Sequence, residues 1–280
     1  MSGVARIRSS ETLNEAGEFV NGITSSVTMV VAAQSLDKWR TDLFSGKEFT
    51  TNGLYRGVGV NCLAVIPVQG LAYGVNKVVL QVLSKDSPES DGKKHLSNGI
   101  ATTVVTPLAV AFERVKVIQQ LTGVSSQRAI EGLYETQSYA GFCKGAVSTW
   151  VRDYIWYLGL FGNHTRMESI QPSMIRHKVL RKMAADAEIG ALVGAVSAPF
   201  DKVRAKMQAD NVLLSQKKRD IYSTLSKTVR QIYQDEGLRG LLAPKGLHAR
   251  MAYASASAIV MGLTTQEYPR HFPSSLHKEN

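Results

Sequence analysis

The sequence has few of the residues that form disulfide bonds or bind metal ions, with 2 cysteines and 6 histidines in 280 residues. Two cysteines exclude a disulfide scaffold and a cysteine-rich zinc module, and we expect Cys62 and Cys143 to pack as small apolar side chains. No P-loop, HExxH or paired CxxC pattern is present, and the glycines around Gly57 do not complete a dinucleotide-binding loop. The sequence therefore predicts no enzyme, no cofactor and no metal site.

Long, strongly hydrophobic runs are also scarce, since the mean hydropathy is −0.09 and 20% of the residues are charged. These averages are typical of a soluble globular protein. They conceal six segments without Asp, Glu, Lys or Arg, the longest of which approach the about 20 residues that cross a bilayer. The six segments are 19–36, 57–76, 96–112, 154–165, 189–200 and 251–266. Hydropathy alone is equally compatible with six buried helices of a soluble α-protein.

A repeated pattern of charges favours the membrane interpretation. An acid followed three residues later by a base recurs near the end of every second segment, with the acids at intervals of 76 and 88 residues. The segments between them each follow a glycine entrance, at Gly57, Gly145 and Gly246. This periodicity predicts three repeats. They span 15–84, 95–168 and 178–270, with tails at 1–14 and 271–280.

The third repeat carries the most complete motif, from Pro199 to Gln208. Its pattern is Pro-x-[Asp/Glu]-x-x-[Lys/Arg], then a linker ending in acid-Gly, then a basic residue and glycine, and it resembles the mitochondrial carrier family. Ser35 and Ala111 replace the proline in the other repeats, which marks a divergent member. The resemblance covers 15–270. It implies an all-α membrane protein with six transmembrane helices, arranged as three tandem helix pairs in a pseudo-threefold bundle.

The resemblance also implies a role for the repeated charges. A charge within a bilayer is costly unless it is paired or faces water. In the family these acids and bases close a ring on the matrix side, each acid meeting the base of a neighbouring helix. The predicted matrix gate pairs Asp37 with Lys116, Glu113 with Arg204, and Asp201 with Arg40. Gln120 and Gln208 are expected to brace these pairs, whereas Phe44 stands at the glutamine position of the first repeat.

The corresponding gate at the cytoplasmic end is incomplete in the sequence. Only Glu267 and Arg270 have the required spacing, so no full ring can be drawn there. This gap leaves open a carrier-like scaffold that does not transport.

The substrate level of the family lies about two turns into the second helix of each repeat. That depth points to Ala64, Arg152 with Asp153, and Tyr253. In an apolar segment, Arg152 and Asp153 form either a self-satisfied pair at a helix contact or a site in which the guanidinium captures a carboxylate or phosphate and the acid an amine. An Arg-acid pair at this level resembles amino-acid-type carriers. Arg250 is either a second cavity cation or a snorkelling interface residue.

These features predict exchange of a small charged metabolite, preferably an amino acid or related zwitterion, across the mitochondrial inner membrane by alternating access. A nucleotide or phosphorylated-anion carrier is the alternative that the net charge of +10 favours. Because the basic residues cluster between the segments, we expect them to meet anionic lipid of the cardiolipin type on the matrix side rather than nucleic acid. We also expect a multi-pass monomer with cytosolic termini and no typical presequence.

Overall fold

The structure is a computed structural model that describes residues 2–85, 90–170, 178–209, 224–242 and 245–271. Within these ranges the chain forms helices and turns and no strand. The long helices are α1 (Ser2–Ser45), α2 (Val58–Leu83), α3 (Asp91–Thr122), α5 (Ala146–Ile170), α6 (Lys178–Gln208) and α9 (Leu247–His271). Three shorter elements connect them: α4 (Ser126–Gln137), the 3-10 turn η1 (Tyr139–Cys143) and α8 (Leu225–Leu242). Each charge-free segment lies in a different long helix, apart from Gly57, which caps α2.

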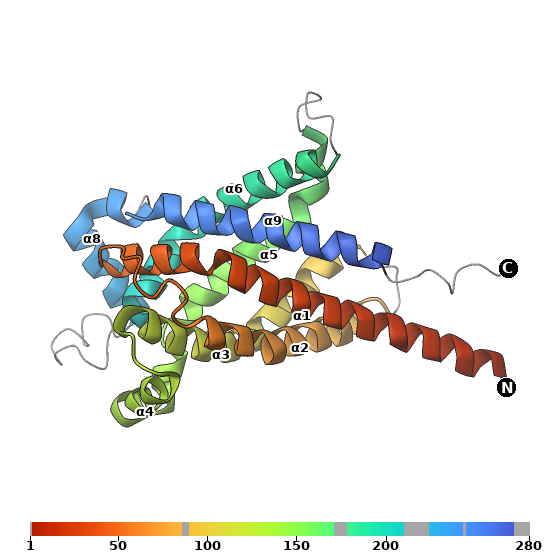
Figure 1. Ribbon diagram of the computed structural model, residues 1–280, viewed down its shortest axis with the longest axis horizontal. Coiled ribbons are helices and arrows are strands. Elements are labelled where there is room, and N and C mark those ends of the chain that lie inside the picture. Colours follow the sequence, from red (N-terminus) through yellow and green to blue (C-terminus); the bar gives the residue numbers. More distant parts are fainter. Residues whose placement is uncertain (1, 86–89, 171–177, 210–223, 243–244, 272–280) are drawn as a thin grey trace.

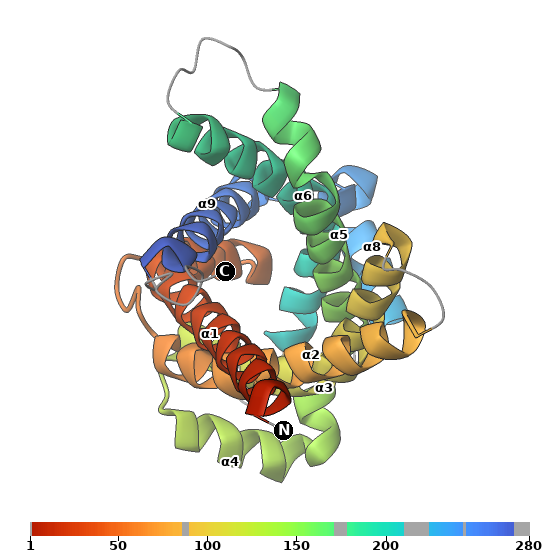
Figure 2. The same ribbon diagram turned by 90° about the vertical axis from the view of Figure 1, so that its right-hand side faces the viewer.

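The six long helices follow one another around a closed ring (Figure 2). Each packs on the next in chain order, and α9 returns to pack on α1. The closest of these pairings joins α6 to α9, and α2 to α3 is another extensive one. The predicted all-α bundle of consecutive helix pairs is therefore confirmed.

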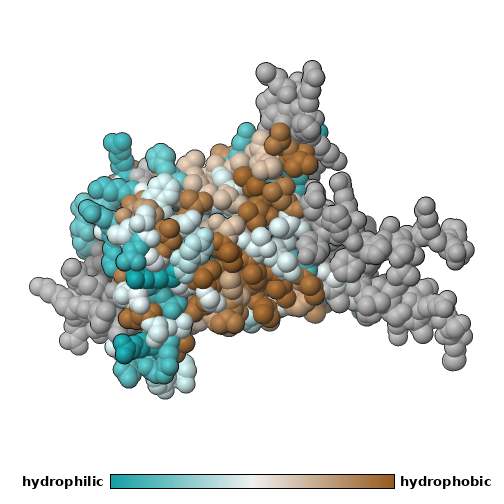
Figure 3. Space-filling view, viewed as in Figure 1, coloured by the Kyte–Doolittle hydropathy of each residue, from teal (hydrophilic) through white to brown (hydrophobic). Residues whose placement is uncertain are grey.

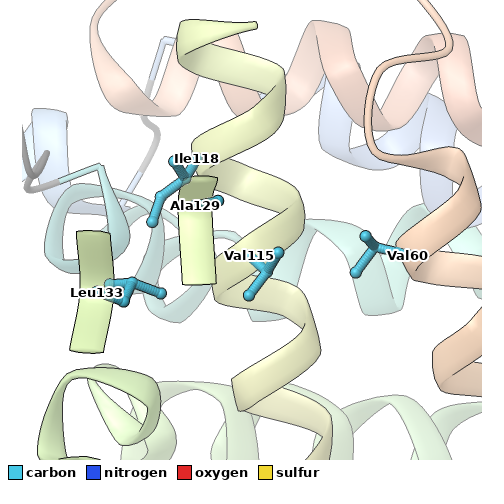
Figure 4. Close-up of a cluster of buried hydrophobic side chains, with 5 residues drawn as sticks. All are labelled: Val60, Val115, Ile118, Ala129 and Leu133. Carbon is cyan, nitrogen blue, oxygen red and sulfur yellow. The ribbon is translucent and has the colours of Figure 1, made fainter. Parts of the chain in front are cut away.

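The two ends of the bundle differ. Helices α4 and α8 lie at one end, and the start of α1 and the end of α9 lie at the other (Figure 1). Between α1 and α2, residues 46–57 form turns and no helix. A buried apolar cluster holds α4 beside α3 and the start of α2 (Figure 4). Its members are Val60, Val115, Ile118, Ala129 and Leu133.

Two glycines one helical turn apart explain the close approach of α6 and α9. A Cβ added to Gly190 would lie 2.6 Å from the carbonyl oxygen of Ala254, and one added to Gly194 would lie 3.0 Å from the Cα of Met251. Small residues at such a spacing let helix backbones approach where lipid gives no hydrophobic drive for association. This contact fixes the inner face of α9 relative to α6.

The outer surface carries an apolar band between the ends of the bundle, with a hydrophilic surface at the α4 and α8 end (Figure 3). Large aliphatic side chains of α2 and α6 are exposed, such as Leu63, Val82 and Val196. Three helices of the described part are long and apolar enough to cross a membrane, by length and composition: Phe19–Ser45, Val58–Leu83 and Val179–Gln208. An apolar surface of this extent is expected where lipid replaces water.

α1 begins at Ser2 and so includes residues of the predicted tail at 1–14. Gly237 interrupts helix α8 with a φ of 66°. Cys143 is exposed and Cys62 is half-buried, so the expectation that both pack in the core was wrong for Cys143. Cys143 lies in a connecting turn rather than in a helix of the bundle, and burial does not extend to it.

Candidate functional site

Near the α4 and α8 end, α1, α3 and α6 bring their repeated acids and bases together at the bundle axis. Lys116 Nζ lies 3.1 Å from Asp37 Oδ2, and Arg40 Nη1 lies 2.8 Å from Asp201 Oδ2. The third pair joins Arg204 to Glu113. Each interhelical pair of the predicted ring is thus formed in the structure, and five of its six side chains are almost completely buried.

The three sides of this ring, which we call the charged ring, are not equivalent. Arg40 and Arg204 each also pair with the acid three residues earlier on their own helix. Lys116 has a single ammonium group and cannot form the bidentate contacts of a guanidinium. Asp201 is the centre of charge, because four guanidiniums lie within 3.4 Å of its carboxylate. They belong to Arg40, Arg152, Arg204 and Arg250.

The residues four after the bases line the next layer toward α4 and α8. Gln120 Nε2 donates to Asp37 Oδ2 at 2.9 Å, and Arg204 Nη1 donates to Gln208 Oε1 at 3.3 Å. Phe44 occupies the third position, fully buried against Ala205 and its neighbours. The layer is therefore polar beneath two sides of the charged ring and apolar beneath the third.

On the other side of the charged ring lies a cavity of about 420 Å³, within the range of small-molecule sites. Residues from α1, α2, α3, α5 and α9 line it, and Glu113 and Lys116 of the charged ring reach its wall. The cavity brings together every residue that the sequence placed at the substrate level. They are Ala64, Arg152, Asp153, Arg250 and Tyr253.

Arg152 is engaged on both edges of its guanidinium. Asp153 Oδ1 accepts from Nε at 2.8 Å and lies 2.7 Å from Nη2. Nη1 lies 2.7 Å from Glu113 Oε1 and 3.4 Å from Asp201 Oδ1. The predicted Arg-Asp pair is therefore also joined to the charged ring, a connection that the sequence did not reveal.

Arg250 points into the bundle and is 3% exposed, which excludes the snorkelling interpretation. Its Nη2 donates to Ser197 Oγ at 3.0 Å, and its Nε lies 3.4 Å from Asp201 Oδ2. Tyr253 links this arginine to the charged ring, because its ring centroid lies 5.7 Å from the guanidinium of Arg250 and 4.4 Å from that of Arg40. Arg250 is thus a second cation at the wall of the cavity.

Sequence reasoning missed several buried cations near the charged ring, among them Lys38, Lys202 and Arg114. Arg114 is fully buried, and it donates to the carbonyl oxygen of Met207 at 3.2 Å and to Gln137 Oε1 at 2.9 Å. It thereby ties α3 to the ends of α6 and α4, where carbonyls favour a cation. Its partners lie 23 and 93 residues away in the chain, so no local pattern indicates them.

Two other predictions meet the limits of the described residues. Glu267 and Arg270 fall in the last part of α9, but their side chains lie outside the described part, so the cytoplasmic gate stays a prediction. Where side chains are described, no group of His, Cys, Asp and Glu residues could hold a metal ion.

Comparison with known proteins shows which proteins the chain is similar to. The family model for mitochondrial carrier proteins matches residues 176–275. The mitochondrial basic amino acids transporter of Mus musculus is 26% identical over 201 residues, which cover 68% of this chain and 63% of the relative. S-adenosylmethionine carrier 1 of Arabidopsis thaliana, chloroplastic/mitochondrial, is 26% identical over 251 residues, or 84% of this chain and 72% of the relative.

A third relative, mitoferrin of Dictyostelium discoideum, is 20% identical over 229 residues, 75% of this chain and 73% of its own. The chain spans just under two thirds of the length of the basic amino acids transporters that it matches. These findings support a divergent member of the mitochondrial carrier family, whose members are multi-pass proteins of the mitochondrial inner membrane.

Proposed function

We propose that the chain exchanges a small charged metabolite across the inner membrane by alternating access, with an amino acid or related zwitterion as the substrate. The observation that carries this proposal is the Arg152–Asp153 pair, which presents opposite charges inside the central cavity. Charges at such a depth are retained at functional sites.

The geometry of the pair suits a zwitterion. Both contacts of Asp153 with Arg152 use Oδ1, and its side chain keeps 27% of its exposure, so Oδ2 can accept from a substrate ammonium group. The arginine offers a planar guanidinium that matches a carboxylate. Two relatives are named for basic amino acids and for S-adenosylmethionine, and both of these contain an α-amino acid group.

The charged ring supports a gate at the end of the bundle that carries α4 and α8. By family resemblance this end faces the matrix, and the ring pairs are closed here. We assign Asp37, Glu113 and Asp201 with their bases to the matrix gate, and Gln120 and Gln208 to its braces. In this structure the charged ring then closes the cavity toward the matrix.

One observation favours the alternative of a phosphorylated anion. The cavity wall carries four cations against the two acids Glu113 and Asp153. The cations are Arg40, Lys116, Arg152 and Arg250. Lys116 and Arg40 are paired with acids of the charged ring, which leaves Arg250 with the weakest acid contact. A carboxylate of an amino acid and a phosphate can both use it.

Uptake into liposomes that contain the purified protein tests the proposal. We expect exchange of labelled amino acids and not of nucleotides, and Arg152→Ala should lower its rate about 10- to 150-fold, as loss of a charged hydrogen bond predicts. Arg128→Ala removes an exposed arginine of α4 and serves as the matched control. Exchange of nucleotides alone would favour the phosphorylated anion, and no exchange of any solute would favour the scaffold without transport.

A further inference from the structure

Arg152 has little capacity to bind a substrate as it stands. A guanidinium has five N–H groups. Nε and Nη2 contact Asp153, while Nη1 contacts Glu113 and Asp201. A substrate carboxylate needs two parallel N–H groups for a bidentate contact. It must therefore replace a carboxylate that Arg152 already holds.

Of the two carboxylates of the charged ring that Arg152 contacts, Glu113 is the one that a solute in the cavity can reach. Its Oε1 is shared between Arg152 of α5 and Arg204 of α6, and its side chain is 12% exposed. Glu113 and Arg152 both line the cavity, so a solute there reaches the ion pair between them directly. Asp201, in contrast, is fully buried and is held by other guanidiniums.

Resting on the proposed function, we propose that Arg152 is a fourth base of the charged ring, and that a substrate carboxylate replaces Glu113 on Arg152. One carboxylate then takes the place of another, so the broken Glu113–Arg152 ion pair is offset by a new ion pair of the same chemistry. Substrate capture and loosening of the Glu113 side of the gate become one exchange of partners. The exchange couples α5, which carries the substrate level, to α3 and α6, which carry the gate.

Two results are expected if Arg152 belongs to the charged ring and are not expected if it takes no part in the gate. Removing the guanidinium should loosen the gate even when no substrate is present. Adding a carboxylate substrate should loosen the gate only while Arg152 is there to receive it. Both effects concern passage through the charged ring and can be measured without transport.

The experiment uses one reporter cysteine at Ala109, which lines the cavity, in the full chain with Cys62→Ser and Cys143→Ser. The protein is reconstituted in one orientation, and a membrane-impermeant thiol reagent is supplied from the α4 and α8 side. Labelling of Ala109→Cys from that side then requires an open ring. Labelling from the opposite side reports whether each variant is folded.

We expect Arg152→Gln to raise the basal rate of labelling from the α4 and α8 side about tenfold or more, since an ion pair of the ring is removed. Arg152→Lys keeps the charge without the fork and should give an intermediate rate. Lys202→Gln is the matched control, because Lys202 is as buried and lies beside Asp201 but pairs with Glu236 of α8. Should Arg152→Gln fail to fold, Arg152→Lys decides the question.

An unchanged basal rate in both Arg152 variants, or an equal rise in Lys202→Gln, would overturn the assignment of Arg152 to the ring. The second part of the experiment measures labelling in the presence of a mixture of the protein amino acids. A parallel sample receives the same mixture as carboxamides, which lack the carboxylate. Acceleration by the acids and not by the amides, abolished in Arg152→Gln, supports the exchange of partners. If amino acids that the protein transports do not accelerate labelling, the exchange of partners is overturned. If the protein transports no amino acid, the proposed function fails, and the basal labelling rates alone decide whether Arg152 belongs to the charged ring.

Discussion

Asp201 is the residue whose loss should damage the protein most, although its two repeat counterparts look equivalent in the sequence. Its carboxylate is fully buried and lies 2.8 Å from both Arg40 Nη1 and Arg204 Nη2. Arg152 and Arg250 follow at 3.4 Å. Asp201→Asn keeps the shape of the side chain and removes the charge. It also replaces one accepting oxygen with an amide N–H donor. The surrounding guanidiniums are donors as well, so they cannot accept a hydrogen bond from it.

The magnitude follows from the uncompensated charge. Removing one partner of a buried ion pair costs about 3–5 kcal/mol. A protein of this size loses roughly 2–4 °C of its unfolding temperature per kcal/mol, so the expected fall is about 6–20 °C. The matched control is Asp153→Asn, because Asp153 keeps 27% side-chain exposure and contacts the single guanidinium of Arg152. Its expected cost is about 1 kcal/mol or less, as for partly solvated pairs.

Thermal unfolding of the detergent-purified variants, followed by circular dichroism, provides the measurement. Expression, detergent and protein concentration are kept equal, so that differences in unfolding temperature report the side chain. A fall for Asp201→Asn no larger than that for Asp153→Asn would show that the four guanidiniums do not depend on this carboxylate. Asp201 would then not be the centre of charge of the ring.

Three further predictions use other parts of the bundle. Gly190→Ala places a Cβ 2.6 Å from backbone atoms of α9 and should cost about 1–3 kcal/mol in thermal unfolding, whereas Gly59→Ala, with nothing within 4 Å, should cost none. Arg250→Ala should raise the KM for exchange about tenfold by removing the second cation, with a smaller effect on stability than Asp201→Asn. Asp37→Lys combined with Lys116→Asp should restore part of the transport that each single substitution loses. The recovery is expected to be partial because Arg40 also contacts Asp37. A double variant that transports no better than either single variant would contradict this pairing.

Local repetition explains which parts of the structure could be predicted. An acid and a base three residues apart share a helix face wherever the helix lies, and the resemblance to the carrier family implies which neighbouring base each acid meets. The pairing of Asp37 with Lys116 could therefore be predicted before the structure. The resemblance also implies the depth of the substrate level, and Arg152 and Tyr253 are found by counting from the entrance glycines. Their place in one cavity comes from the same repetition.

The threefold pattern hides how unequal the three sides are. Asp201 contacts four guanidiniums, and that of Arg250 comes from α9, which packs closely on α6 at Gly190 and Gly194. Asp37, on α1, meets Arg40, Lys116 and Gln120 instead. Such differences depend on interhelical distances, which no pattern of residue types specifies. A repeat thus predicts which residues meet but not how many others join them.

The same limit applies to the substrate site, and it bears on the mechanism. In a low-dielectric interior a guanidinium does not stand unpaired while it waits for a ligand, since an uncompensated charge costs several kcal/mol or more. The resting state of any substrate-level cation is therefore a contact with some acid of the protein, and the identity of that acid decides what binding disrupts. For Arg152 the acids include Glu113, a member of the charged ring. A motif that names the cation leaves its resting partner unknown, and the resting partner is what can connect recognition to the gate.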